Sequence, residues 1–239
     1  MFETLLIKPL YNGFIYLIGV MPGGDVGLAI IALTLITRIV FYPAFAASIK
    51  TQMGMQAAQG EIDEINKKYK DDSEARARAT MALYKEKDIH PFAGFLALLV
   101  QIPVFLALYF ALFREGLPHV ASELLYPFVH VPAVVDISFF GLLELMQPHN
   151  IALSIVVAGL QYGVAHLSMA RTAPGAANLP KERQAAHRMQ RQMMLYFLPV
   201  LMGVVSYSLP AAVGLYFAAG NLVSLGQELV IKRQLSRKD

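Results

Sequence analysis

The sequence predicts an all-α integral membrane protein with five transmembrane helices. The 239-residue chain is 56% hydrophobic and only 15% charged, whereas an average soluble domain carries about 25% charged residues. The charged residues cluster between long apolar stretches. Each of these stretches approaches the ~20 residues that a helix needs to cross the hydrocarbon core of a bilayer.

Five apolar stretches are predicted as spans, and one further helix precedes them. Glu3, Lys8 and Pro9 argue against a cleavable signal peptide at the start of the chain. Apolar residues recur there at helical spacing, so we expect a helix in the membrane interface, with a true span as the alternative. Pro210 suits the first turn of the last helix, where its missing N–H costs little.

The predicted segments follow in this order: an N-terminal interfacial helix (1–26), span 1 (27–48), a cytoplasmic helical hairpin (49–92), span 2 (93–113), an outer loop (114–149), span 3 (150–170), a cytoplasmic loop (171–192), span 4 (193–209), span 5 (210–231) and a basic cytoplasmic tail (232–239). In the outer loop, Leu124–Phe128 and Ile137–Met146 are too short to span, so we expect them to lie along the interface.

The lysines and arginines predict the orientation. Eight lie in 50–91, five in 171–192 and four in 232–239, against two on the other side, Lys8 and Arg114. Because cytoplasmic loops carry the excess of basic residues, we expect the N-terminus outside and the C-terminus in the cytoplasm. An odd number of spans agrees with this orientation.

The region 49–92 is predicted to form two amphipathic helices separated by a break at 70–72, with Ser73 as the cap of the second. The apolar face consists of Ile62, Ile65 and Tyr69 in the first helix and of Ala77, Met81 and Tyr84 in the second. Eight basic residues stand beside eight acidic ones here, whereas a nucleic-acid arm would be more one-sided. A structural hairpin and a docking element for a partner or a nascent chain both remain open.

Arg38 is the main candidate functional residue, because it lies near the middle of span 1 and no span carries an acidic residue at its centre. A central arginine costs about 2.5–3.5 kcal/mol on insertion. We therefore expect a hydrated cavity or a bound anionic group around it. The alternative is that Arg38 snorkels toward the interface or bonds backbone carbonyls inside the bundle. Further polar side chains within the spans are Thr34, Gln101, Gln161, Tyr162, Tyr216, Asn221 and Gln227.

Enzymatic functions are not favoured, and we expect no cofactor and no metal. The span interiors lack the two acids of an aspartyl protease, and Ser154 and His166 lie ~18 Å apart along one helix. Neither a metal-ligand spacing nor a phosphate-binding glycine motif is present. A small-solute or anion channel or transporter that uses Arg38 remains the alternative, although acidic relays and inverted repeats are not evident.

Four motifs resemble the YidC/Oxa/Alb family of membrane protein insertases, in the same order and over essentially the whole chain. They are Leu33–Arg38 with Tyr42-Pro43, Ala82–Glu86 with His90-Pro91, Gln101–Tyr109, and Pro199 with Leu209–Phe217 and Asn221. The resemblance implies a bacterial multi-pass protein of the cytoplasmic (inner) membrane, with a five-span core and a hydrophilic groove centred on Arg38.

In this family the groove receives polar segments of nascent membrane proteins and releases their apolar helices into the lipid, without nucleotide hydrolysis. The resemblance thus implies nascent chains and the lipid bilayer as partners, and allows contact with the Sec translocon and with the ribosome and signal recognition particle pathway. The expected groove residues are Arg38, Thr34, Gln101, Gln161, Tyr216 and Asn221. The expected docking residues are Lys67, Lys68, Tyr84, Arg188, Arg191, Lys232 and Arg233.

Overall fold

The computed structural model describes residues 8–92, 101–102, 104–114, 116–169, 188–189 and 191–235, and these are mainly helical. The helices are α1 (Lys8–Val20), α2 (Val26–Val40), α3 (Tyr42–Ala57), α4 (Gln59–Lys68), α5 (Ser73–Glu86), the helix Val104–Phe113, α7 (Ile151–Met169), α9 (Leu198–Ser208) and α10 (Ala211–Leu235). Short 3-10 turns lie at Pro22–Gly24 and Ser122–Leu124, and π-helical turns at Phe110–Arg114 and Met193–Phe197. The predicted helical fold class is confirmed.

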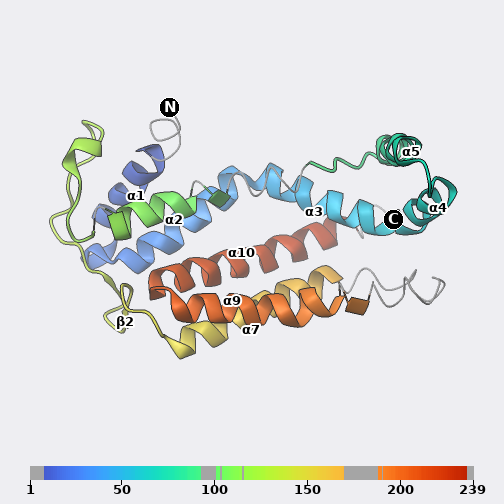
Figure 1. The fold of residues 1–239 in the computed structure, drawn as a ribbon. Helices are drawn as coiled ribbons and strands as arrows, with labels where there is room; N and C mark the ends of the chain where they lie inside the picture. The colour runs from blue at the N-terminus through green and yellow to red at the C-terminus, as the bar shows by residue number, and fades with distance from the viewer. Residues whose placement is uncertain are drawn as a thin grey trace.

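Figure 1 shows an elongated bundle. In it α1, α2 and the helix Val104–Phe113 lie along one side of α10, while α7 and α9 lie along the other. The β-structure of the described residues is a two-stranded antiparallel hairpin in the outer loop, β1 (Ser138–Phe139) with β2 (Leu143–Glu144), and one isolated bridge.

The helices of the described residues differ in their capacity to span a membrane. By length and composition α7 suffices alone, α2 and α3 suffice only as a bent pair, and Val104–Phe113 and Met193–Ser208 are apolar but shorter. Helix α10 has 25 residues, about 37 Å at 1.5 Å per residue, but polar side chains interrupt it. The five-span count and the orientation therefore remain predictions.

The predicted span 27–48 is not one straight helix. Helix α2 ends at Val40, α3 begins at Tyr42, and the two are bent by 69°. Pro43 lies in the first turn of α3. Because proline has no N–H and its ring crowds the carbonyl four residues earlier, a straight helix could not continue through this point. The bend places the last turn of α2 opposite the middle of α10.

The main hydrophobic core lies at the end of the bundle that contains α1. Phe14, Ile15 and Ile18 on one face of α1 are fully buried, together with Val26 and Ile30 of α2. The spacing of three and four residues along α1 is the pattern of a helix with one apolar face. The expected helix near the N-terminus is therefore present, and it packs against α2.

Helices α7, α9 and α10 pack closely through glycines. A Cβ at Gly203 of α9 would lie 3.1 Å from that of Ala158 on α7, and one at Gly214 of α10 would lie 2.8 Å from Leu153 on α7. Small residues let helix backbones approach, as they do in membrane bundles. The outward faces of α7 and α9 are apolar and exposed, with Ile155 67% and Val200 63% accessible. Lipid would cover such faces in a spanning bundle.

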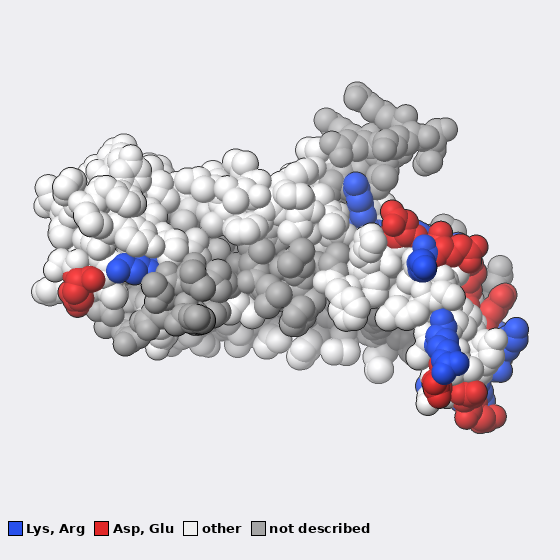
Figure 2. Space-filling model, turned by 90° about the horizontal axis from the view of Figure 1, so that it is seen from above, with Lys and Arg blue, Asp and Glu red and all other residues white. Residues whose placement is uncertain are grey.

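Helices α4 and α5 form the predicted hairpin at the opposite end of the molecule. Figure 2 shows the charged side chains gathered at this end, while the part of the bundle described on this face is almost free of them. Leu83 and Ile89 are buried with Ala58 in a small cluster separate from the main core. The predicted face of α5 is wrong in part, because Met81 is 52% exposed and Leu83 takes the buried position.

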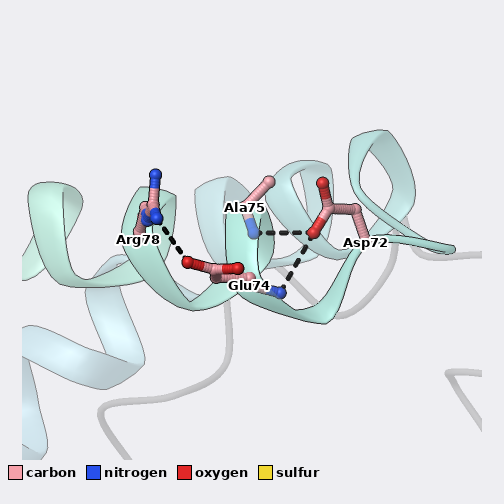
Figure 3. Close-up of polar contacts among 4 residues, drawn as sticks. All are labelled: Asp72, Glu74, Ala75 and Arg78. Atoms are coloured by element: carbon pink, nitrogen blue, oxygen red, sulfur yellow. Dashed lines mark hydrogen bonds and ion pairs between the residues drawn. The ribbon is translucent and has the colours of Figure 1, made fainter.

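The predicted cap of α5 is also wrong by one residue. Oδ1 of Asp72 accepts hydrogen bonds from the backbone N–H groups of Glu74 and Ala75, at 3.1 and 2.9 Å (Figure 3). Ser73 is the first residue inside the helix. Asp and Ser cap helices about equally well, so the sequence pattern could not decide between two adjacent candidates.

Candidate functional site

Arg38 lies in the last turn of α2, just before the bend. Its guanidinium carbon is 4.2 Å from the centroid of the Phe45 ring on α3, a cation–π contact. Its Nη2 lies where α10 carries a glycine, since a Cβ at Gly220 would be 3.5 Å away. The backbone carbonyl of Arg38 accepts a 3.4 Å hydrogen bond from Nε2 of Gln227. Three helices thus surround this half-buried side chain.

Sequence reasoning missed Phe45 and Gly220 as neighbours of Arg38. Phe45 follows Arg38 by seven residues, and in an unbroken helix this spacing of about two turns would place both side chains on one face. That spacing could have indicated Phe45 as a neighbour of Arg38. Gly220 carried no such signal, because nothing in the sequence indicates which face of α10 meets α2.

Gln101 and Tyr216 form a second polar contact, which links the second predicted span to α10. Nε2 of Gln101 donates to the hydroxyl of Tyr216. Tyr216 is 3% exposed and precedes Gly220 by one turn. Gln101, Tyr216 and Arg38 therefore lie along one side of α10.

Thr34 lies one turn before Arg38 on α2, and its hydroxyl is used within its own helix. Oγ1 donates to the carbonyl of Ile30 at 2.7 Å. Thr37 does the same to the carbonyl of Leu33 at 2.8 Å. Threonines within helices commonly bond in this way. Thr34 keeps its acceptor capacity on the Arg38 face.

Asn221 lies on another face of α10. At ~100° per residue, Asn221 stands ~140° around the helix from Tyr216. Gly220, which faces Arg38, stands only ~40° from Tyr216. Gly214 and Leu225, which contact α7, stand on the Asn221 side. The structure thus directs Asn221 toward α7, away from Arg38.

Gln161 comes from α7 and is half-buried, one turn after the fully buried Val157. Within the described residues it forms no hydrogen bond that would join it to Arg38. The structure brings Gln101 and Tyr216 together and places Arg38 on the same side of α10.

Polar capacity is left unused at Arg38 and at two places on α10, one of them on the face that meets α7. Ion pairs join Arg78 to Glu74 and Lys87 to Glu61 in the α4–α5 region. None is formed between Arg38 and a carboxylate of the described residues. On α10, Nδ2 of Asn221 and Oε1 of Gln227 are buried without a hydrogen-bond partner in the described part of the chain. Such groups are costly unless water or a ligand satisfies them.

The end of the bundle opposite the α4–α5 hairpin is closed by hydrogen bonds between the N-terminal region and the outer loop. The side chain of Asp25 accepts from the N–H of Leu28 at 2.9 Å and from that of Phe140 at 2.8 Å. The backbones of Gly24, Val26 and Asp136 are joined by two 2.9 Å bonds. The N–H of Ser138 also bonds the carboxylate of Asp136 and lowers its pKa.

Asn12 of α1 completes this closure. It is 2% exposed, donates to the carbonyl of Leu124 at 2.9 Å and accepts from the N–H of Tyr126 at 2.6 Å. The hydroxyl of Tyr11 accepts from the N–H of Ala121 at 3.1 Å. Sequence reasoning assigned no role to these residues, because their partners lie more than a hundred positions away.

Some of the predicted docking residues lie in the α4–α5 hairpin. Lys67 and Lys68 are exposed in the last turn of α4, and Tyr84 of α5 packs partly against the small cluster. Arg188 and Arg191 are exposed, while Lys232 and Arg233 lie in the last turns of α10 with only their backbone described. Residues 1–7, 93–100, most of the predicted loop 171–192 and 236–239 are outside the described residues.

Comparison with known proteins places the chain. A family model for the 60Kd inner membrane protein matches residues 18–238. The chain belongs to this family. It is accordingly a membrane protein, and the predicted family membership is confirmed.

Relatives of the chain carry the name membrane protein insertase YidC. The relative from Oceanobacillus iheyensis is 30% identical over 240 residues, which cover 99% of this chain and 85% of the relative. Those from Cellvibrio japonicus and Neisseria gonorrhoeae are each 32% identical over 98% and 90% of this chain. The chain spans only 37% and 34% of these two longer relatives.

Proposed function

We propose that this protein is a membrane protein insertase and chaperone of the bacterial cytoplasmic membrane. A hydrophilic groove centred on Arg38 would receive a polar segment of a nascent membrane protein, and the apolar helix of that substrate would pass into the lipid. The relatives named as insertases support the activity. The position of Arg38, enclosed by α2, α3 and α10 without a carboxylate partner among the described residues, supports the groove.

The energetics of insertion make such a groove useful. Burial of the substrate's apolar helix is favourable by about 25 cal/mol for each Å² of apolar surface, so the net reaction needs no nucleotide. The barrier arises from the polar segment, since each unsatisfied polar group in hydrocarbon costs several kcal/mol. A half-buried cation with polar neighbours would lower this barrier for an acidic or amide-rich segment.

Contacts of the exposed α4–α5 hairpin and of the basic C-terminal region with the Sec translocon or the ribosome form part of the proposal. Lys67 and Lys68 are exposed and available for such contacts. Arg188 and Arg191 support the same role, since they stand exposed just before the helical segment Met193–Ser208.

The charge of Arg38 can be tested in liposomes that contain the purified protein and no ATP. Single-span substrates with an acidic and with a neutral translocated segment are compared. Arg38→Glu should reduce insertion of the acidic substrate more than that of the neutral one, because the electrostatic interaction changes sign. Arg38→Lys keeps the charge but loses the planar stacking on Phe45, so it should retain the preference for the acidic segment at a lower rate.

Two results would contradict the proposal. An equal loss on both substrates with Arg38→Glu would assign Arg38 a structural role. Anion flux through the same liposomes without any insertion would instead make the protein a channel. Melting temperatures of the variants in detergent would separate loss of function from loss of folding.

A further inference from the structure

We propose that the tip of the β1–β2 hairpin, Phe140-Gly141-Leu142, inserts into the lipid interface and anchors the end of the bundle opposite the α4–α5 hairpin. This inference depends on the chain being a membrane protein, and it is independent of the insertase activity and of Arg38.

The tip carries the most exposed apolar side chain of the outer-loop residues that the structure describes. Leu142 is 92% exposed and Phe140 65%. Between Ser138 and Glu144 the sequence is Phe-Phe-Gly-Leu-Leu, with no polar or charged side chain. Adjacent exposed apolar side chains are rare on surfaces that face only water.

The hairpin is held rigidly to the bundle. The N–H of Phe140 bonds Oδ2 of the buried Asp25 at 2.8 Å, which ties the hairpin to the start of α2. Within the hairpin, the N–H of Leu142 bonds the carbonyl of Phe139 at 3.1 Å. The Phe139 ring fills the space beside Gly27, where a Cβ would come within 2.5 Å of it. Because the tip is already ordered, little conformational entropy is lost when it inserts.

The backbone at the tip carries an aromatic residue in an unfavourable conformation. Phe140 has φ +53° and Gly141 has φ +67°. Glycine, asparagine or aspartate is favoured at such positions, and a bulky residue there is an outlier. A large apolar side chain kept at a strained turn indicates that the side chain itself has a use.

The position of the hairpin favours lipid as the occupant. Six residues separate the end of β2 from the start of α7, the helix that is long and apolar enough to span (Figure 1). The first turn of α7 already presents an exposed apolar residue, Ile151, 63% accessible. Exposed polar residues, among them Glu144 and Gln147, lie between the tip and this turn. Aromatic and apolar side chains next to such a polar band are typical of the membrane–water interface.

The sequence also predicts the kind of lipid contact. No lysine or arginine lies between Arg114 and Arg171. The tip itself therefore offers no cation to anionic headgroups, and Lys8 of α1, which contacts this loop, already packs over the Tyr126 ring at 5.4 Å. Insertion should depend mainly on apolar burial.

The test uses tryptophan fluorescence, since the chain contains no tryptophan. Leu142→Trp and the control Glu123→Trp, at an exposed charged position of the same loop, are placed in phosphatidylcholine vesicles. The emission of Leu142→Trp should shift to shorter wavelength, and lipids brominated near the glycerol backbone should quench it more strongly than they quench the control. Replacing part of the phosphatidylcholine by phosphatidylglycerol should change neither result.

A second readout uses the absence of cysteine. Leu142→Cys should react with a water-soluble maleimide more slowly than Glu123→Cys in the same vesicles. Equal reaction rates together with water-like emission from Leu142→Trp would overturn the proposal. A blue-shifted emission that brominated lipid does not quench would also overturn it, because the tip would then be covered by protein.

Discussion

In the predicted span 27–48, the contacts of Arg38 do not offset the cost of placing a cation there. A central arginine costs about 2.5–3.5 kcal/mol, whereas a cation–π contact such as the one with Phe45 contributes about 0.5–2 kcal/mol. The described residues supply no carboxylate for an ion pair with it. The remaining cost must be met by water or by a polar group from another molecule, and this difference is the physical basis of the proposed groove.

Gly220 is predicted to make room for Arg38. A Cβ at this position would stand at ordinary contact distance, 3.5 Å, from Nη2, so Gly220→Ala should retain activity. Gly220→Leu should displace the guanidinium and reduce insertion activity, with an overpacking cost of about 1–3 kcal/mol.

The matched control is Gly226→Leu, on the same helix, where nothing lies within 4 Å of a Cβ. Insertion of the acidic substrate and the melting temperature would be measured for all three variants. If Gly226→Leu impaired the protein as much as Gly220→Leu, the space at Gly220 would have no special role.

Site residues could be predicted where the signal is local in the sequence, and could not where it depends on a contact between residues far apart in the chain. Arg38 could be found because a charge within an apolar run is visible in the sequence, and Gln101 and Tyr216 because they are polar within predicted spans. Gly220 and Asn12 could not be found, because their roles depend on partners distant in the chain. Asn221 looked equivalent to Tyr216 until the rotation of α10 was known.

At the scale of elements, apolar runs and their breaks located most of the helices. The bend at Phe41 was missed, although Pro43 was its signal, because an uninterrupted apolar run hides a local change of direction. The outer-loop hairpin was expected only as a short segment along the interface. Its strands have two residues each, too few for alternation to be recognised, and it depends on Asp25 for support.

The two candidate caps of α5 give a prediction at this scale. Asp72→Ala should destabilise the start of α5 by about 0.5–2 kcal/mol, because the N–H groups of Glu74 and Ala75 lose their acceptor. Ser73→Ala is the control and should have little effect, since Ser73 lies inside the helix.

Amide hydrogen exchange at residues 74–78 would measure the difference, with faster exchange expected in Asp72→Ala only. Equal protection of the first turn in both variants would show that the cap contributes nothing to this helix.

At the scale of the whole molecule, the two ends have different construction. One end contains the main core and is closed by Asn12 and Asp25, which tie α1 and α2 to the outer loop. The other end carries the charged hairpin, whose small cluster shares no residue with the main core. This separation implies that the hairpin can be removed without unfolding the bundle.

Replacing Glu61–Lys85 by a short glycine–serine linker should therefore leave the bundle folded and reduce insertase activity. Two contacts outside the deleted segment keep the residues after the hairpin against α3. Gly54 contacts Ile89, and the Thr51 hydroxyl donates a 3.1 Å hydrogen bond to the carbonyl of His90. Membrane integration would be checked by resistance to alkaline extraction, and activity by insertion of the single-span substrates. A lower activity with unchanged integration would assign the hairpin a role in substrate or partner recruitment. Wild-type activity would show that the hairpin has only a structural role, and that insertion depends on the spans alone.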